Sequence, residues 1–241
     1  FTDDDCLPTP TWLERLCAPL LTGVEEVRPA LVVQGRTMPV PEESAKAGGW
    51  DRTIWVLRPT WLFETCNIAY RMCDLTAVGG FPGRTDTPPN PSGKQVAEDA
   101  LAGWKVIEHG AALVFEPGAV VHHRVEPSTY AVWLRDIRGR AVFPALAGAH
   151  PLARRAFWGR WFLSSRSAAT VLAVAAGVLW LVTGRRSWLA GLLPWVVSAL
   201  PEARHRPGRP LVVRLAQLAL GDLVGLAATS QASLRHRRLV L

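Results

Sequence analysis

The chain has 241 residues, of which 49% are apolar, and this combination predicts one or two packed domains. Its four cysteines include no CxxC pair, which argues against a structural zinc site and predicts reduced thiols. The charge is divided unevenly, because residues 151–241 contain 13 Lys/Arg and 2 Asp/Glu whereas residues 1–150 contain 14 and 18. A basic region that also carries long uncharged apolar runs argues against nucleic acid as a partner and favours a phospholipid membrane.

Residues 1–150 alternate predicted helices and strands, which is the pattern of an α/β domain. In chain order we expect a helix from Thr9, a strand over 29–39 and a loop over 39–52. Residues 63–83 are expected to form a strand end, a short helix and a Gly-Gly turn, followed by a mobile loop over 84–95. A helix over 96–111 then precedes two short strands around a Pro-Gly turn over 112–124.

Residues 151–241 predict apolar, membrane-associated helices. Residues 167–184 are an uncharged run of 18, about 27 Å as a helix and close to the ~30 Å hydrocarbon thickness. A second uncharged run, 187–201, is about a turn too short to span and is broken by Pro194. Residues 211–230, interrupted by Arg214 and Asp222, predict an interfacial helix. Arginine-rich flanks favour a hairpin with both ends cytoplasmic, whereas Arg185 and Arg186 at its tip count against one. A re-entrant or interfacial pair, or a buried core helix, remains an alternative.

Three groups of residues have metal-binding or acid–base chemistry. Adjacent carboxylates at Asp3, Asp4 and Asp5 suit a hard divalent cation such as Mg²⁺ or Mn²⁺, although an acidic turn has the same composition. Glu98-Asp99 begins a predicted helix, where a carboxylate can act as a general base or simply stabilise the helix dipole. His122-His123 ends a predicted strand, where a histidine can complete a metal site or lie on the surface.

These groups occur in a recognisable order. The segments FTDDDCLPTPTWLERL, CNIAYRMCDLTAVGGFP, EDALAGWKVIEHG and EPGAVVHHR resemble the second half of the catalytic domain of family 2 glycosyltransferases, over about residues 1–125. The apolar segments and the closing SLRHRRLVL resemble the membrane-associated tail of some bacterial members. The resemblance implies a partial GT-A fold over 1–150, whose N-terminal nucleotide-binding half is expected to be missing from this sequence, followed by the membrane-associated region 151–241.

The resemblance also implies roles for individual residues. Asp99, beside Glu98, is expected to be the catalytic base, and Asp5, Asp3 and His123 are expected to bind Mg²⁺ or Mn²⁺, with His122 the weaker candidate. The expected nucleotide-sugar-binding residues are Asp3, Asp4, Asn67, Arg71 and Trp104.

The function implied is inverting transfer of a sugar from a nucleotide-diphospho-sugar to an acceptor hydroxyl at the cytoplasmic face of the membrane. Two alternatives stay open on the residues alone. One is a non-enzymatic membrane protein with a structural acidic cluster, and the other is a different metal-dependent phosphoryl-transfer enzyme.

Overall fold

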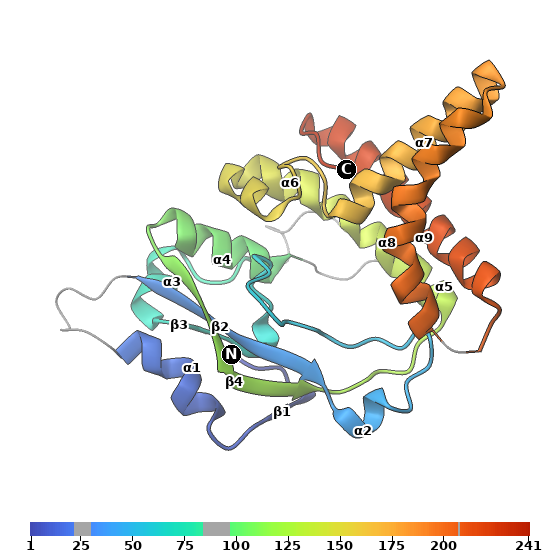
Figure 1. The fold of residues 1–241 in the computed structure, drawn as a ribbon. Helices are drawn as coiled ribbons and strands as arrows, with labels where there is room; N and C mark the ends of the chain where they lie inside the picture. Colours follow the sequence, from blue (N-terminus) through green and yellow to red (C-terminus); the bar gives the residue numbers. More distant parts are fainter. Residues whose placement is uncertain (22–29, 84–96, 207) are drawn as a thin grey trace. The chain divides into compact units, whose positions relative to one another are not determined.

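The computed structural model describes residues 1–21, 30–83, 97–206 and 208–241 (Figure 1). The chain forms two compact units. The first takes in most of residues 1–128, and the second contains Thr129–Leu241 together with Gly48–Trp50. Residues 129–150, which the sequence analysis grouped with the α/β domain, therefore belong to the second unit.

The first unit is built on a mixed four-stranded sheet, in agreement with the predicted α/β class. The strands are β1 (Cys6–Pro8), β2 (Leu31–Pro39), β3 (Ile68–Tyr70) and β4 (Ala112–His123), in the order β1-β4-β2-β3. The two long strands, β2 and β4, are parallel at the centre, and the short outer strands are antiparallel to them. The end of β4 therefore meets the start of β1 at one edge of the sheet.

The predicted strand over 29–39 and the predicted helices of this unit are present. The helices are α1 (Trp12–Leu21), α2 (Pro41–Ser44), α3 (Met72–Ala77) and α4 (Glu98–Glu108), with a 3-10 turn η2 (Thr65–Asn67) before β3. The short helix α2 was not predicted, since it lies within the loop expected over 39–52. Leu16 and Leu20 of α1 are buried on the sheet against Val33, Ala69 and Ala119, as the helical spacing predicted. Gly79 and Gly80 both adopt positive φ after α3, which fits the predicted turn. The loop predicted over 84–95 lies outside the described residues.

The prediction of two short strands over 112–124 was wrong. β4 is one strand of 12 residues, and its pairing with β2 shifts between Gly35, opposite Glu116, and Arg36, opposite Val120. The Pro-Gly pair occupies this irregularity, where the Gly118 N–H donates to the Glu116 side chain at 2.8 Å. The Pro-Gly pair, which by itself predicts a turn, therefore lies in a bulge within one continuous strand.

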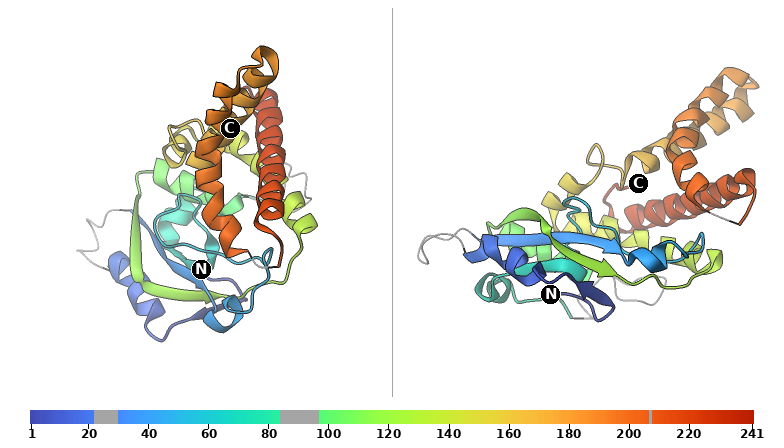
Figure 2. Two further views of the ribbon diagram at one scale, coloured as in Figure 1. Left: turned by 45° about the vertical axis from the view of Figure 1, so that its right-hand side comes forward. Right: turned by 60° about the horizontal axis from the view of Figure 1, so that its bottom comes forward.

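The second unit is helical. Its α-helices are α5 (Tyr130–Asp136), α6 (Val142–Ala149), α7 (Ser165–Thr183), α8 (Leu193–His205) and α9 (Leu211–His236), and its 3-10 segments are η3 (Ile137–Ala141), η4 (Pro151–Ala156) and η5 (Arg186–Leu192). In Figure 2, α7 doubles back through η5 into α8. By length and composition, α7 and α9 are the two described helices able to cross a membrane. The predicted second apolar run is thus a 3-10 segment continued by a helix, and Pro194 lies in that helix's first turn, where proline is tolerated.

An aromatic cluster packs α4 onto the segment before η2. Trp104 is fully buried, its ring stacks on Trp61 at 5.4 Å between centroids, and it meets Phe63 edge-on at 5.6 Å. The helix approaches so closely that a Cβ added at Gly103 would lie 2.1 Å from the Phe63 ring.

We therefore expect Gly103→Ala to lower the free energy of unfolding of the first unit by about 2 kcal/mol, because the new methyl group overpacks the Phe63 ring. Thermal or urea unfolding measures the change. Gly177→Ala is the control, since an added Cβ there meets nothing within 4 Å and the helix gains propensity. Equal unfolding midpoints for Gly103→Ala and the wild type would contradict the packing described.

Candidate active site

The sheet edge brings Asp5 and His123 together. Cys6 in β1 pairs with His123 in β4, and the His123 Nε2 atom lies 3.4 Å from Oδ2 of Asp5. The other ring nitrogen, Nδ1, is 2.7 Å from the Arg124 carbonyl oxygen, so it carries the proton and donates there. In the neutral ring, Nε2 therefore carries no proton, and its lone pair is directed at Asp5. This is the form of the imidazole ring that binds a metal.

A third ligating side chain, Cys6, joins this pair. The ligand atoms of Asp5, Cys6 and His123 all lie within 4.8 Å of one another. Burial raises the pKa of the Cys6 thiol, which keeps the sulfur protonated and weak as a ligand. Carboxylate oxygens bind hard divalent cations and imidazole nitrogens suit transition metals, so this set of donor atoms does not select a particular ion. Cys6 was not among the predicted metal ligands, although it directly follows Asp5 in the sequence.

Thr65 connects the other two carboxylates. Oδ2 of Asp99 accepts hydrogen bonds from the Thr65 N–H at 3.1 Å and from its hydroxyl at 3.2 Å. The same hydroxyl lies 3.5 Å from Oδ1 of Asp3. Two acids from distant parts of the sequence, one before β1 and one in the first turn of α4, therefore share one threonine.

The surroundings of these acids favour their protonated forms. Burial raises the pKa of Asp99 to about 6, against which the two Thr65 hydrogen bonds act. Burial, followed by the neighbouring Asp5 charge, raises the pKa of Asp3. A carboxylate with a pKa near neutrality is suited to accept a proton at physiological pH.

The backbone around Asp99 and Thr65 is strained. Ala97, two residues before Asp99, has φ +70°, and Phe63, two residues before Thr65, has φ +58°. A residue with a Cβ in this left-handed region costs on the order of 1 kcal/mol or more and persists where packing requires it. Both strained residues precede a member of the carboxylate–threonine contact.

The remaining acid and histidine candidates are Asp4, Glu98 and His122. Asp4 is exposed, and Glu98 is half-buried with no hydrogen-bond partner for Oε2 among the described residues. His122 projects from the opposite face of β4, where Nδ1 lies 3.3 Å from the Pro39 carbonyl. His123 is thus the histidine that meets Asp5.

Asn67 and Trp104 occupy structural positions. Asn67 is buried, its Nδ2 donates to the carbonyls of Arg36 and Ala119, and its Oδ1 accepts from the Trp12 indole at 2.9 Å. These bonds bridge the β2–β4 irregularity and use both amide N–H groups and the amide oxygen. Trp104, fully buried beneath Trp61, exposes no face on which a sugar can stack. In this arrangement both side chains support packing, in place of the sugar-binding role expected for them, and Arg71 is half-buried directly before α3.

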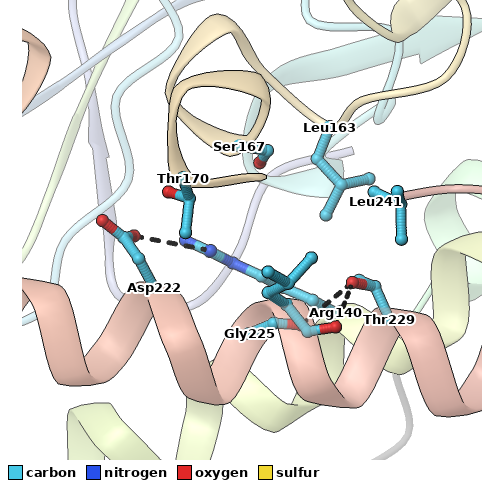
Figure 3. A pocket seen from close by; sticks show the side chains of 9 residues that line it. Arg140, Leu163, Ser167, Thr170, Asp222, Gly225, Thr229 and Leu241 are labelled. Atoms are coloured by element: carbon cyan, nitrogen blue, oxygen red, sulfur yellow. Dashed lines mark hydrogen bonds and ion pairs between the residues drawn. The ribbon is translucent and has the colours of Figure 1, made fainter. Parts of the chain in front are cut away.

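The second unit has a polar cluster of its own (Figure 3). Asp222 of α9 is buried, and its Oδ2 accepts from Arg166 Nε at 2.7 Å and from Trp195 Nε1 at 2.9 Å. Arg140 lies 4.0 Å from the other carboxylate oxygen, beside a cavity of about 10 Å³, roughly one water. Arg166 also binds Glu202. Along the sequence, Asp222 is only an interruption of the apolar stretch 211–230.

Comparison with known proteins leaves the geometry as the basis for assigning function: no protein-family model, curated protein or solved structure matches this chain.

Proposed function

We propose that the chain is part of an inverting, metal-dependent glycosyltransferase of the GT-A type, acting on a nucleotide-diphospho-sugar and an acceptor hydroxyl at the cytoplasmic face of a membrane. The observation that carries the proposal is the contact of Thr65 with both Asp99 and Asp3. It joins the acids of two motifs, and the Asp5–His123 pair joins the first motif to the third. The apolar helices of the second unit support the membrane part.

Asp99 is the proposed general base. Its Oδ2 is held by Thr65, which leaves Oδ1 to accept the proton of the acceptor hydroxyl. Two hydrogen bonds to one oxygen fix the orientation of the carboxylate, so the attacking hydroxyl meets a positioned base. With the base on the acceptor side, the oxygen attacks the anomeric carbon opposite the leaving diphosphate, and the configuration inverts.

Asp5, Asp3 and His123 are the residues that would hold Mg²⁺ or Mn²⁺, with Asp3 and Asp4 directed to the nucleotide. Such an ion, when bound, offsets the negative charge that develops on the diphosphate leaving group.

The test is a donor panel. The full-length protein in membranes is incubated with nucleotide-diphospho-sugars, Mn²⁺ and a membrane extract, and both sugar incorporation and nucleoside diphosphate release are measured. We expect sugar incorporation that stops when the metal is chelated. Release of inorganic phosphate without sugar transfer would instead assign phosphoryl-transfer chemistry. Absence of both products across the panel would contradict an enzymatic role.

Replacement of His123 provides a separate test of the metal site. We expect His123→Ala to weaken Mn²⁺ binding by about 10- to 100-fold, because an imidazole ligand is lost. Calorimetric titration measures the affinity, with the unfolding temperature checked in parallel. His122→Ala is the matched control, since that ring faces Pro39. Loss of binding in the His122 variant alone would place the site on the other face of β4.

A further inference from the structure

The hairpin formed by α7, η5 and α8 packs in the opposite way to a helical hairpin of a soluble protein, which buries its large apolar side chains. Its large apolar side chains point outward: Val178 is 53% exposed, Leu181 75%, Val182 77%, Leu193 62% and Val197 62%. The two legs meet instead through small residues, because a Cβ added at Gly191 would lie 2.6 Å from Cβ of Ala176. Close contact through small residues, with branched chains outside, is how helices pack within lipid. In water such a surface is an unpartnered apolar patch.

The charges on the hairpin are spaced to match a bilayer. Arg166 lies in the first turn of α7 and Arg185 directly follows its C-cap, a separation of about 28 Å along a helix against ~30 Å of hydrocarbon. The return leg is lengthened by η5, since a 3-10 segment rises about 2.0 Å per residue. Residues 187–200 thereby reach about 24 Å, and the run that is too short as an α-helix comes close to the span.

Exposed tryptophans mark both ends of the hairpin. Trp158 and Trp161, just before α7, are 54% and 49% exposed, and the Arg154 guanidinium lies 5.0 Å from the Trp161 ring centroid. At the tip, Trp180 and Trp188 are 39% and 41% exposed on either side of Arg185-Arg186. Indole rings and arginines at both ends of an apolar segment are the pattern of the two membrane–water interfaces.

The Asp222 cluster determines the placement of α9. Asp222 is near the middle of α9, yet it binds Arg166 in the first turn of α7, at the base of the hairpin. Figure 1 shows that α9 is not parallel to α7. If α7 crosses the bilayer, the centre of α9 is therefore held at the level of the headgroups. The exposed apolar side chains of α9 then face the interface: Val212, Leu220, Leu223 and Leu234.

We propose that α7, η5 and α8 form a hairpin that crosses a phospholipid bilayer, with Arg185-Arg186 at the far headgroups, while α9 lies in the plane of the near interface. The base carries more arginines than the tip and so takes the cytoplasmic side. This proposal deepens the membrane part of the proposed function and uses none of its transfer chemistry. Its tests measure topology and binding, so loss of transfer activity leaves it standing.

Protease protection tests the crossing. Inside-out membrane vesicles containing the full-length protein are treated with external trypsin, and the peptides are identified by mass spectrometry. We expect cleavage after Arg160 and Arg204, while the bonds after Arg185 and Arg186 stay intact until detergent is added. Cleavage after Arg185 or Arg186 together with Arg160 and Arg204 in sealed vesicles would overturn the crossing. Cleavage after Arg185 and Arg186 with Arg160 and Arg204 protected would overturn the orientation.

Replacing an apolar residue of the hairpin by a charged one tests whether the surface of the hairpin is inserted in the bilayer. Val178 is exposed and lies within the proposed hydrocarbon, so Val178→Asp is expected to reduce the carbonate-resistant membrane fraction by about tenfold without unfolding the chain. Leu234→Asp, on the 81% exposed residue of α9, is the matched control and is expected to change that fraction less than about twofold. If Val178→Asp instead only dissociated a dimer and left membrane binding unchanged, the hairpin would be a contact between two copies, and the bilayer assignment would fail.

Discussion

Asp99→Asn is expected to reduce sugar transfer by at least about 10³-fold while making the folded chain more stable at neutral pH. The loss of activity follows because the amide cannot accept the acceptor proton. The gain in stability follows because burial penalises the charged carboxylate. The amide oxygen can still accept both hydrogen bonds from Thr65, so the local structure is retained. A loss of activity together with a gain in stability would identify Asp99 as a group that is retained for function at a cost in stability.

The stability gain has a defined pH dependence. The pKa of Asp99 is about 6 when folded and its ordinary value is 3.8, so the folded state binds the proton more tightly. Below about pH 4 both states are protonated and the variants should match. As pH rises toward 6 the wild type loses stability, and above 6 the difference is complete, on the order of 1–2 kcal/mol after screening by solvent. Thermal unfolding at pH 4 and pH 7.5 measures it.

Two further variants distinguish catalysis from packing. The wild-type value of kcat/KM should rise with pH through about 6 as Asp99 loses its proton. Thr65→Val removes the hydroxyl hydrogen bond that lowers this pKa, so the rising limb should move to higher pH. Asp4→Asn, on an exposed acid, should leave the limb in place. Near-wild-type turnover in Asp99→Asn would rule out Asp99 as the base.

Asp222→Asn is expected to destabilise the second unit by about 3–5 kcal/mol, because it leaves the Arg166 guanidinium partly buried without its buried counter-charge. Glu202→Gln is the matched control on the same arginine. The Glu202 side chain is 41% exposed against 7% for Asp222, so its loss should cost less than about 1 kcal/mol. Unfolding in detergent micelles, followed by circular dichroism, measures both.

A double replacement separates the ion pair from the shape of the site. Arg166→Met combined with Asp222→Leu removes both charges and keeps apolar volume, so it should be less destabilised than Asp222→Leu alone. A double variant as unstable as the sum of its singles would show that the two charges do not stabilise one another.

Local pattern was enough for the elements themselves. The spacing of Leu16 and Leu20 predicts the buried face of α1, the apolar run over 31–33 predicts β2, and the uncharged run of 167–184 predicts α7, because each depends on the period of a single segment. The alternation of these elements also indicates the α/β class of the first unit.

Only the tertiary structure decides which side chains meet, because strand pairing and helix docking join residues that no local period connects. The pairing of β1 with β4 brings Asp5, Cys6 and His123 together, and the docking of α4 beside η2 places Asp99 on Thr65. The same packing buries Trp104, which the resemblance to family 2 glycosyltransferases assigns to nucleotide-sugar binding. In α9, Asp222 is a polar interruption when read along the chain. In the folded chain Asp222 fixes the position of α9, because Arg166 and Trp195 from two other helices bind its carboxylate. These contacts offset the cost of burying its charge.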